Sequence, residues 1–330
     1  MRVAFILNPA AKNGRAGRLQ GTLVDAARTA GLDPTLVLTT APGSGTDIAR
    51  DLAGRFDAVV AVGGDGTVQE VMAGLRGTDA AFGVVPMGTG NDFAAALGMS
   101  TRLPVAMAQI ATSLQAGTSA LDLGRVRWRD EGSDLVHERL FSNCLGAGFD
   151  GLAAHFAPRF KRLGGQLSYM AAIVKALGQW KQNVEVDVFV DDEASADAAG
   201  LGSQPNASAQ VFSGPFFLCD IGNGHSVGGG FHLTPDASPT DGLLDVCCAA
   251  PLSLRRIAVV LPMAQRGRHT TQREITMGRG SRVVLRATSG RLPMHADGEA
   301  LSRAAVEVVV EVLPGAVRAI GPALAGGGQA

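Results

Sequence analysis

The pattern of hydrophobic and polar positions is clearest at residues 58–75. Five consecutive apolar residues, 58–62, predict a buried strand. After a run that contains three glycines, apolar side chains return at the spacing of one buried helix face. That face is formed by Val68, Val71, Met72 and Leu75. The segment therefore predicts a strand, a glycine-rich turn and a helix in succession.

The turn, Gly63–Thr67, places a single carboxylate, Asp65, among glycines. Thr67 and Glu70 have the spacing of a capping box, which predicts Thr67 as the N-cap of the helix. Free backbone N–H groups and the helix dipole favour an anion there, most often a phosphate. Because a carboxylate repels phosphate, Asp65 indicates that a cation such as Mg²⁺ lies between them. The alternative is a turn in which glycine only relieves backbone strain.

Three more apolar segments in the first third of the chain, 3–7, 34–40 and 81–86, also predict strands that are followed by helices. Alternating strands and helices predict a parallel α/β sheet, in which the strand-to-helix loops meet at one edge. The last of these strands leads into a second glycine-rich turn, 87–94, which contains Asp92. We therefore expect the two glycine-rich turns to lie side by side at the carboxyl edge of the sheet.

The alternation of predicted strands and helices ends near Asp122, and predicted strands then alternate with loops. Residues 183–190 alternate between apolar and polar side chains, which predicts a half-exposed antiparallel strand, and residues 211–221 predict one further strand. The sequence thus predicts an α/β domain over residues 1–122 and a β-rich domain over residues 123–311. Residues 312–330 are expected to pack back on the first domain.

The composition excludes several classes of protein. A chain of 330 residues that is 46% hydrophobic and 18% charged suits two folded domains rather than a disordered chain. A net charge of -1 argues against nucleic acid as a partner. Four cysteines without a Cys-x-x-Cys motif predict reduced thiols and a cytoplasmic chain. No apolar run approaches the roughly 20 residues of a membrane span, so membrane contact would be peripheral.

Several motifs along the chain resemble, in the same order, those of the diacylglycerol, sphingosine and related lipid kinases. The matching segments are 63–67 (Gly-Gly-Asp-Gly-Thr), 86–93, 143–150, 222–230, 235–245 and 297–299 (Asp-Gly-Glu). NAD kinases share the first motif, but their other segments have no match here. The resemblance implies a nucleotide-binding α/β domain of the NAD kinase/diacylglycerol kinase type, followed by a β-sandwich-like domain.

The same resemblance implies ATP and Mg²⁺ as ligands of the first domain. A threonine at the end of the second strand should contact the nucleotide, and both Thr39 and Thr40 qualify. The residues that the resemblance places around the nucleotide are Asn8, Pro9, Ala10, Ala11, Lys12, Thr39, Thr40, Gly64, Asp65, Gly66, Thr67, Val68, Gln69, Glu70, Thr89, Asn91 and Asp92.

The Asp-Gly-Glu segment would supply the catalytic carboxylates, with Asp65 as a third. A kinase needs a carboxylate that accepts the proton of the attacking hydroxyl. The resemblance implies that Glu299 is this base, and that Asp297 is the alternative base or lies on the metal side. By itself, Asp-Gly-Glu is a common hairpin turn. The resemblance also implies a structural Mg²⁺ at Ser238, Asp241 and Leu243, where spacing alone would indicate only a tight turn.

The predicted function is ATP-dependent phosphorylation of a lipid hydroxyl by an enzyme that is cytoplasmic and peripheral at the membrane surface. Basic residues between Arg266 and Arg273 could face anionic lipid, although a solvated loop is the simpler interpretation. The alternatives are a NAD kinase-like enzyme and a non-catalytic nucleotide or lipid sensor. The sequence leaves open which lipid is used and whether the chain forms a homo-oligomer.

Overall fold

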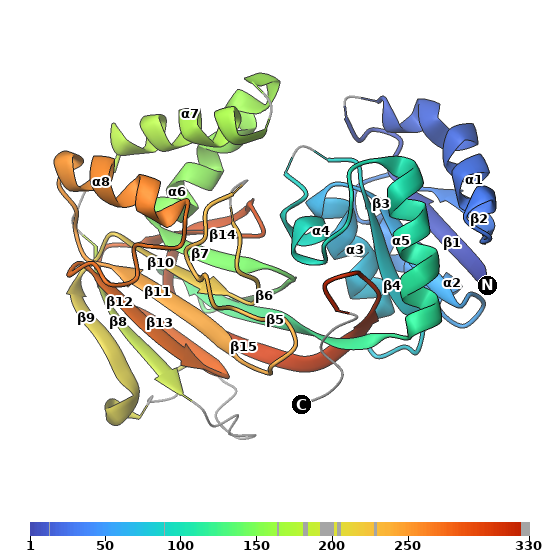
Figure 1. The fold of residues 1–330 in the computed structure, drawn as a ribbon. Coiled ribbons are helices and arrows are strands. Elements are labelled where there is room, and N and C mark those ends of the chain that lie inside the picture. The colour runs from blue at the N-terminus through green and yellow to red at the C-terminus, as the bar shows by residue number, and fades with distance from the viewer. Residues whose placement is uncertain are drawn as a thin grey trace. The chain divides into compact units, whose positions relative to one another are not determined.

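The computed structural model describes residues 1–12, 14–88, 90–163, 165–180, 184–191, 201–202, 206–227 and 230–324. The chain divides into two compact units (Figure 1). Unit 1 comprises Met1–Asp122 and Pro314–Ala330, and unit 2 comprises Leu123–Leu313. The strands β5 and β15 contribute residues to both units.

Unit 1 contains a parallel sheet with the strand order β2-β1-β3-β4. Every residue of β3 and β4 is buried, which explains why both strands are unbroken apolar runs in the sequence. These four strands are β1 (Arg2–Leu7), β2 (Asp33–Leu38), β3 (Ala58–Gly63) and β4 (Ala81–Pro86). The C-terminal end of β15 lies beside β4, where Ile320 N–H donates to the Phe82 carbonyl at 2.9 Å.

The helices of unit 1 connect and cover these strands (Figure 1). They are η1 (Ala16–Leu19), α1 (Gln20–Thr29), α2 (Ser44–Leu52), α3 (Asp65–Leu75), α4 (Asp92–Ala96) and α5 (Leu103–Ala116). Helices α2 and α3 pack so closely that a Cβ on Gly74 would lie 2.2 Å from the Thr46 carbonyl oxygen. Only glycine fits there, and the contact places the last turn of α3 against the first turn of α2.

Unit 2 is built from two layers of strands that share β15. One layer follows the order β12-β11-β10-β7-β14-β15, and the other contains β9, β8, β13, β15, β5 and β6. The bounds are β5 (Ser119–Asp130), β6 (Val136–Phe141), β7 (Cys144–Gly148), β8 (Glu185–Asp191), β9 (Gln210–Pro215), β10 (Leu218–Gly222), β11 (Leu244–Ala249), β12 (Ile275–Gly280), β13 (Arg282–Ser289), β14 (Leu292–Ala296) and β15 (Glu299–Ala319). Buried Val, Leu and Phe side chains from both layers form one core between them.

The single strand predicted over residues 211–221 is wrong, because the segment forms two strands in different layers. β9 pairs with β8, whereas β10 pairs with β7 and β11. The break falls at Phe216 and Phe217, whose side chains pack into different cores. Phe216 N–H donates to the Val184 carbonyl next to β8, whereas Phe217 N–H donates to the Ala249 carbonyl of β11, so the chain changes layers between these two residues.

Helices cover the outer face of the β7–β10–β11 layer (Figure 1). They are α6 (Phe149–Phe156), η2 (Ala157–Leu163), α7 (Gly165–Leu177) and α8 (Leu254–Ala264), and the short η3 (Ala207–Ala209) precedes β9. Their apolar sides form a second core with the sheet. All four cysteines are buried free thiols, as predicted. None of the helices in the described part of the chain has both the length and the apolar character needed to cross a membrane.

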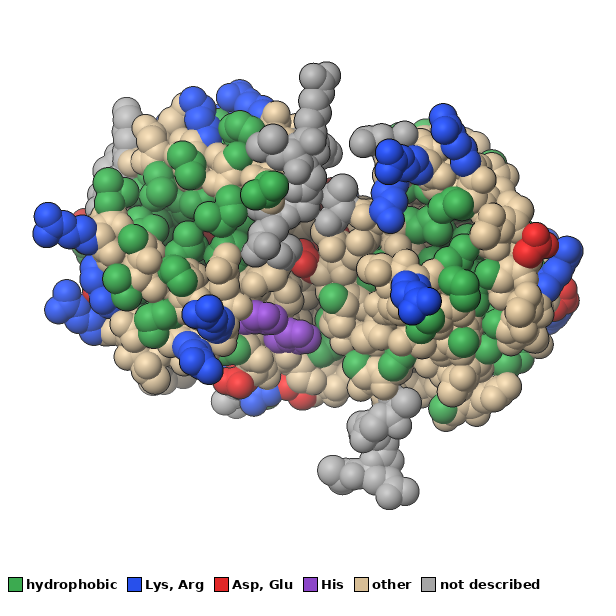
Figure 2. Space-filling model, turned by 45° about the horizontal axis from the view of Figure 1, so that its top comes forward, with side chains coloured by type: hydrophobic (Ala, Val, Ile, Leu, Met, Phe, Trp, Pro, Cys, Tyr) green, Lys and Arg blue, Asp and Glu red, His purple; other side chains and the backbone are tan. Residues whose placement is uncertain are grey.

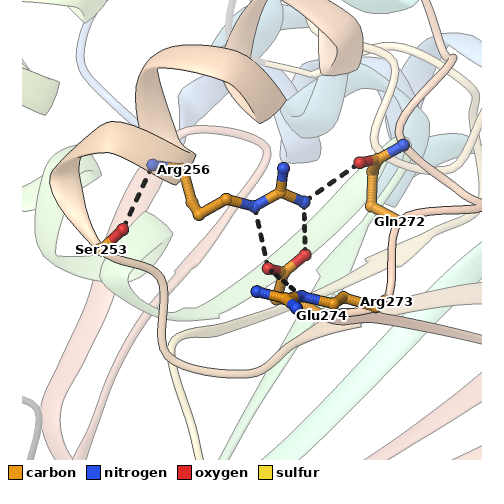
Figure 3. A network of polar contacts seen from close by, with 5 residues as sticks. All are labelled: Ser253, Arg256, Gln272, Arg273 and Glu274. Atoms are coloured by element: carbon orange, nitrogen blue, oxygen red, sulfur yellow. Dashed lines mark hydrogen bonds and ion pairs between the residues drawn. The ribbon is translucent and has the colours of Figure 1, made fainter.

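A polar network fixes the start of α8 (Figure 3). Ser253 Oγ accepts the Arg256 N–H, so Ser253 caps the helix. The Arg256 guanidinium donates to both oxygens of Glu274 at 2.9 and 2.7 Å and to Gln272 at 3.1 Å. The hydrogen bond from Arg256 is the main cause that lowers the pKa of Glu274 from 4.5 to about 2. The bidentate pair ties α8 to the chain that enters β12.

This network predicts a pH-dependent contribution to stability. Because the folded pKa of Glu274 lies below its unfolded value, the contribution is present above about pH 4.5 and is lost as the pH falls toward about 2. We expect Glu274→Gln to lower the melting temperature at neutral pH, and the difference from wild type to shrink below about pH 4.5. Thermal unfolding at several pH values checks this, with Glu185→Gln on β8 as the control. A difference that stays constant with pH would contradict the prediction.

Candidate active site

The loops at the carboxyl ends of β1, β2, β3 and β4 are held together by backbone hydrogen bonds. Asn8 N–H donates to the Val62 carbonyl, and Thr39 N–H donates to the Leu7 carbonyl, both at 3.0 Å. Met87 N–H, after β4, donates to the Gly63 carbonyl at 2.7 Å. Four loops are therefore fixed along one edge of the parallel sheet, which is where this class of sheet binds its ligands.

The two glycine-rich turns touch one another, as predicted from the sequence. A Cβ on Gly88 would lie only 2.5 Å from the Gly64 Cα, and a Cβ on Gly64 would lie 3.1 Å from the Gly88 Cα. Position 88 therefore requires glycine, because the Gly64 backbone occupies the space of any side chain, and a side chain at position 64 would need the Gly88 backbone to shift. This contact brings the start of α3 and the loop before α4 into one surface.

Asp65 lies at the first residue of α3 and is partly exposed. Its Oδ2 accepts the Asn91 N–H at 2.9 Å. A Cβ on Gly90 would lie 2.8 Å from Asp65 Oδ2 and 3.7 Å from Asp92 Oδ2. Two carboxylates on neighbouring turns thus approach the same glycine. Carboxylate oxygens are the ligands that Mg²⁺ prefers, so the chemistry of this donor set fits a divalent cation.

The predicted capping box is wrong. Helix α3 begins at Asp65 with Gly64 as its N-cap, so Thr67 lies inside the first turn. The Glu70 carboxylate instead accepts the N–H groups of Gly43 and Gly45 at 2.8 and 2.9 Å. The reason is the close packing of α2 on α3, which brings the start of α2 within reach of this side chain.

The remaining predicted nucleotide residues differ in what they can offer a ligand. Asn8 Oδ1 accepts the Ala10 N–H at 3.0 Å, and Asn8 Nδ2 donates to Thr67 Oγ1 at 3.2 Å. The exposed residues are Ala10, Lys12 and Thr40, and the partly exposed ones are Asn8, Pro9, Ala11, Thr39, Gly64, Asp65, Gly66, Glu70, Asn91 and Asp92. Thr67, Val68 and Gln69 are buried, and Thr89 lies outside the described residues.

In unit 2, Asp297 and Gly298 form the two-residue turn between β14 and β15. Both have positive φ values, 46° and 80°, as a type I′ hairpin requires. The Asp297 carboxylate accepts the N–H groups of Ser142, Asn143 and Cys144 at 2.7 to 2.9 Å, and the Ser142 hydroxyl at 2.7 Å. These hydrogen bonds engage both of its oxygens and attach the hairpin to the start of β7.

Glu299 directly follows this turn and has a different environment. Its side chain is 51% exposed and forms an ion pair with Arg139 of β6 at 2.7 Å. A carboxylate held at the surface by one guanidinium can accept a proton, whereas Asp297 already accepts four hydrogen bonds. Of the two carboxylates, Glu299 is therefore the more exposed.

In the predicted metal turn, Asp241 pairs with an arginine of β12. Asp241 Oδ1 accepts the Leu243 N–H at 3.0 Å, and Asp241 Oδ2 accepts a hydrogen bond from Arg279. Ser238 Oγ lies 3.1 Å from Thr240 Oγ1. Among the described residues, no group of three His, Cys, Asp or Glu side chains is arranged to hold a metal ion. As these side chains lie, they do not fit Mg²⁺, and the assignment of Ser238, Asp241 and Leu243 stays a prediction.

A parallel sheet with two touching glycine-rich turns, followed by a β-sandwich unit, defines a class of nucleotide-dependent kinases. A model of the diacylglycerol kinase catalytic domain matches residues 2–126, and a model of the YegS C-terminal NAD kinase beta sandwich-like domain matches residues 143–321. The predicted fold class, an α/β domain followed by a β-sandwich-like domain, is therefore confirmed.

Known proteins resemble the chain over most of its length. It is 28% identical to diacylglycerol kinase of Mycobacterium tuberculosis H37Rv over 97% of this chain and 95% of that protein. It is 30% identical to diacylglycerol kinase of Bacillus subtilis 168 over 82% of this chain and 80% of that protein. The crystal structure of a putative diacylglycerol kinase from Bacillus anthracis Sterne superimposes with a TM-score of 0.72 at 21% identity, covering 98% of this chain and 96% of the other.

The chain belongs to the family of diacylglycerol kinases and YegS-like lipid kinases. It is thus a kinase that uses ATP as the phosphoryl donor and a lipid alcohol as the acceptor. The predictions of an enzyme and of a lipid kinase are confirmed by the same matches.

Proposed function

We propose that this kinase transfers the γ-phosphate of ATP to a hydroxyl of diacylglycerol or of a related lipid alcohol. The observation that carries the proposal is the pair of carboxylates, Asp65 and Asp92, on two touching glycine-rich turns. A protein that only bound a nucleotide or a lipid would not also need carboxylates that can act as a base, such as Asp297 and Glu299, because binding requires no proton acceptor. The relatives in two bacteria that bear the name diacylglycerol kinase support this acceptor class.

In unit 1, the N-terminal backbone of α3 and the two glycine-rich turns bind the phosphates. Asp65 and Asp92 would hold Mg²⁺, which, when bound, neutralises charge on the phosphates and on the developing transition state. Asn8 positions the loop after β1 by its hydrogen bonds to Ala10 and Thr67. Most of the rate enhancement then comes from positioning and charge stabilisation.

In unit 2, Glu299 accepts the proton of the attacking lipid hydroxyl. Its ion pair with Arg139 holds the carboxylate in one place before the substrate binds. Asp297 fixes the hairpin turn through its hydrogen bonds to residues 142–144, so its carboxylate has a structural role.

Incubation of the protein with labelled ATP and a panel of acceptors tests the proposal. The panel contains diacylglycerol, monoacylglycerol, a sphingoid base and NAD. We expect label in the organic phase, with diacylglycerol or a related lipid as the best acceptor. Label only in NAD would establish the NAD kinase alternative, and ATP binding without transfer to any acceptor would establish the sensor alternative.

The outer faces of α7 and α8 provide a surface for the membrane that contains this substrate. Leu167, Val174, Leu254 and Val259 are 50–71% exposed, although α7 and α8 belong to one buried core on their other side. Neither helix contains an acidic residue. Exposed cations lie on or near these helices: Arg159, Lys175, Arg255, Arg266 and Arg268. Figure 2 shows apolar side chains and Lys and Arg side chains on one face of the molecule.

An apolar surface bordered by cations complements a membrane with anionic headgroups. We expect Val174→Glu combined with Leu254→Glu to weaken binding to vesicles of phosphatidylglycerol and phosphatidylcholine at least about tenfold, because two exposed apolar contacts are lost. Vesicle sedimentation measures this. The control is Val105→Glu combined with Leu135→Glu, which changes charge equally at exposed apolar positions outside α7 and α8. Equal losses in both double variants would refute the assignment of this surface.

A further inference from the structure

A buried histidine contacts the turn that precedes Glu299. His295 is the fourth residue of β14 and is 1% exposed. Its Nδ1 accepts the Gly298 N–H at 3.1 Å. The same turn is attached on its other side by Asp297, whose N–H donates to the Cys144 carbonyl at 2.9 Å. The hairpin is therefore held from two directions, and His295 supplies one of them.

A carboxylate fixes the other nitrogen of the ring. His295 Nε2 lies 2.6 Å from Asp150 Oδ2, and Asp150 is 5% exposed at the start of α6. The Tyr169 hydroxyl of α7 donates to Asp150 Oδ1. Burial alone would raise the pKa of Asp150, but the attraction to His295 and the hydrogen bonds from His295 and Tyr169 outweigh it and lower this pKa.

Gly146 makes room for the pair. It is the β7 residue that pairs with His295. A Cβ at this position would lie 2.2 Å from Asp150 Oδ2 and 2.3 Å from His295 Nε2. Any side chain at position 146 would displace the two groups, so the strand, the helix and the ring fit together only with glycine there.

These contacts define one tautomer. Because Nδ1 accepts from Gly298, the proton of the neutral ring lies on Nε2 and is donated to Asp150. If the proton were on Nδ1, it would point at the Gly298 N–H, and Nδ1 could no longer accept this hydrogen bond. Burial lowers the pKa of His295, while Asp150, Asp220 and Asp297 raise it above its ordinary value. The neutral ring is therefore best observed at mildly alkaline pH.

We propose that His295 is a positioning residue for the catalytic carboxylate: its Asp150-bound ring accepts the Gly298 N–H and so sets the direction in which the backbone presents Glu299. This inference rests on the proposed role of Glu299 as the base. Similar outer-shell partners orient reactive groups in many enzymes, and small displacements of a reacting group can cost about a hundredfold in rate.

A test of the geometry does not depend on kinase activity. The protein is labelled with ¹⁵N-histidine, and the signals of its six histidines are recorded at mildly alkaline pH. His295→Asn identifies the signal of His295 by its loss. We expect proton coupling only to Nε2. A proton on Nδ1 would overturn the inference, whatever the role of Glu299 is.

Kinetics with ATP and diacylglycerol in mixed vesicles, at the same mildly alkaline pH, test the consequence. We expect His295→Ala to lower kcat about 10- to 100-fold with little change in the KM for ATP. His295→Asn should recover most of kcat, because its amide oxygen can accept the Gly298 N–H. His155→Ala is the control, since His155 on α6 contacts the Gly151 carbonyl and not the turn. An unchanged kcat in His295→Ala, or equal losses in a folded His295→Asn, would overturn the inference.

Discussion

Glu299→Gln is expected to reduce phosphoryl transfer to the lipid by about 10²- to 10⁴-fold, the range typical for loss of a general base. Glutamine has nearly the same shape as glutamate but cannot accept the proton of the attacking hydroxyl. Because Glu299 is 51% exposed and its ion pair is with a surface arginine, we expect the fold and ATP binding to remain intact.

Initial rates with saturating ATP and diacylglycerol, together with a direct ATP-binding measurement, check this result. Asp297→Asn is the informative comparison, because an amide NH₂ group would oppose backbone N–H donors of residues 142–144. That variant should lose stability by about 1–3 kcal/mol as well as activity. If Glu299→Gln keeps near wild-type activity while Asp297→Asn stays folded and is inactive, the base is Asp297.

The fold of unit 1 could be predicted from the sequence because its determinants are local. Strands β3 and β4 are buried on both faces and so form unbroken apolar runs. The glycines after them mark the turns, and the chain order of strands and helices gives the parallel sheet. The contact between Gly64 and Gly88 then follows from topology, since neighbouring parallel strands end at the same edge.

Predictions failed where packing between elements overrode a local pattern. Thr67 and Glu70 have capping-box spacing, but α2 presents the N–H groups of Gly43 and Gly45 to the Glu70 carboxylate. The competing partner of Glu70 is not visible in a sequence window, because it lies elsewhere in the chain. Residues 211–221 differ, because Gly214 and Pro215 interrupt the apolar run and are a local signal of the break before Phe216 and Phe217 enter different cores.

In the candidate site, too, local motifs were predictable from the sequence, whereas contacts between distant segments were not. The motif around residues 297–299 was recognisable, and the resemblance already indicated Glu299 as the base. The different hydrogen-bond partners of its two carboxylates could not be predicted, because they come from residues 139–144, far away in the sequence. The contact of His295 with Asp150 joins residues that are 145 positions apart. One signal was available: Gly146 and Gly148 interrupt an otherwise apolar strand, which is typical of a close approach by another group.

Asp65→Asn is expected to lower kcat about 10²- to 10³-fold and to raise the Mg²⁺ concentration needed for half-maximal activity. The expected loss comes from the missing negative charge and not from a change in the structure of the turn. An asparagine at this position can still accept the Asn91 N–H through its amide oxygen, so the contact between the two turns is retained. What is lost is one of the two carboxylates that approach Gly90.

Activity as a function of Mg²⁺ concentration at fixed ATP measures both effects, and the melting temperature shows whether the turn is intact. Asp25→Asn is the matched control, because this exposed aspartate on α1 lies away from the loops at the strand ends. Equal Mg²⁺ dependence in wild type and Asp65→Asn, with rates within about threefold, would mean that the glycine-rich turn binds phosphate without a metal-binding carboxylate. In that case the role of Asp65 would be limited to the hydrogen bond that it accepts from Asn91.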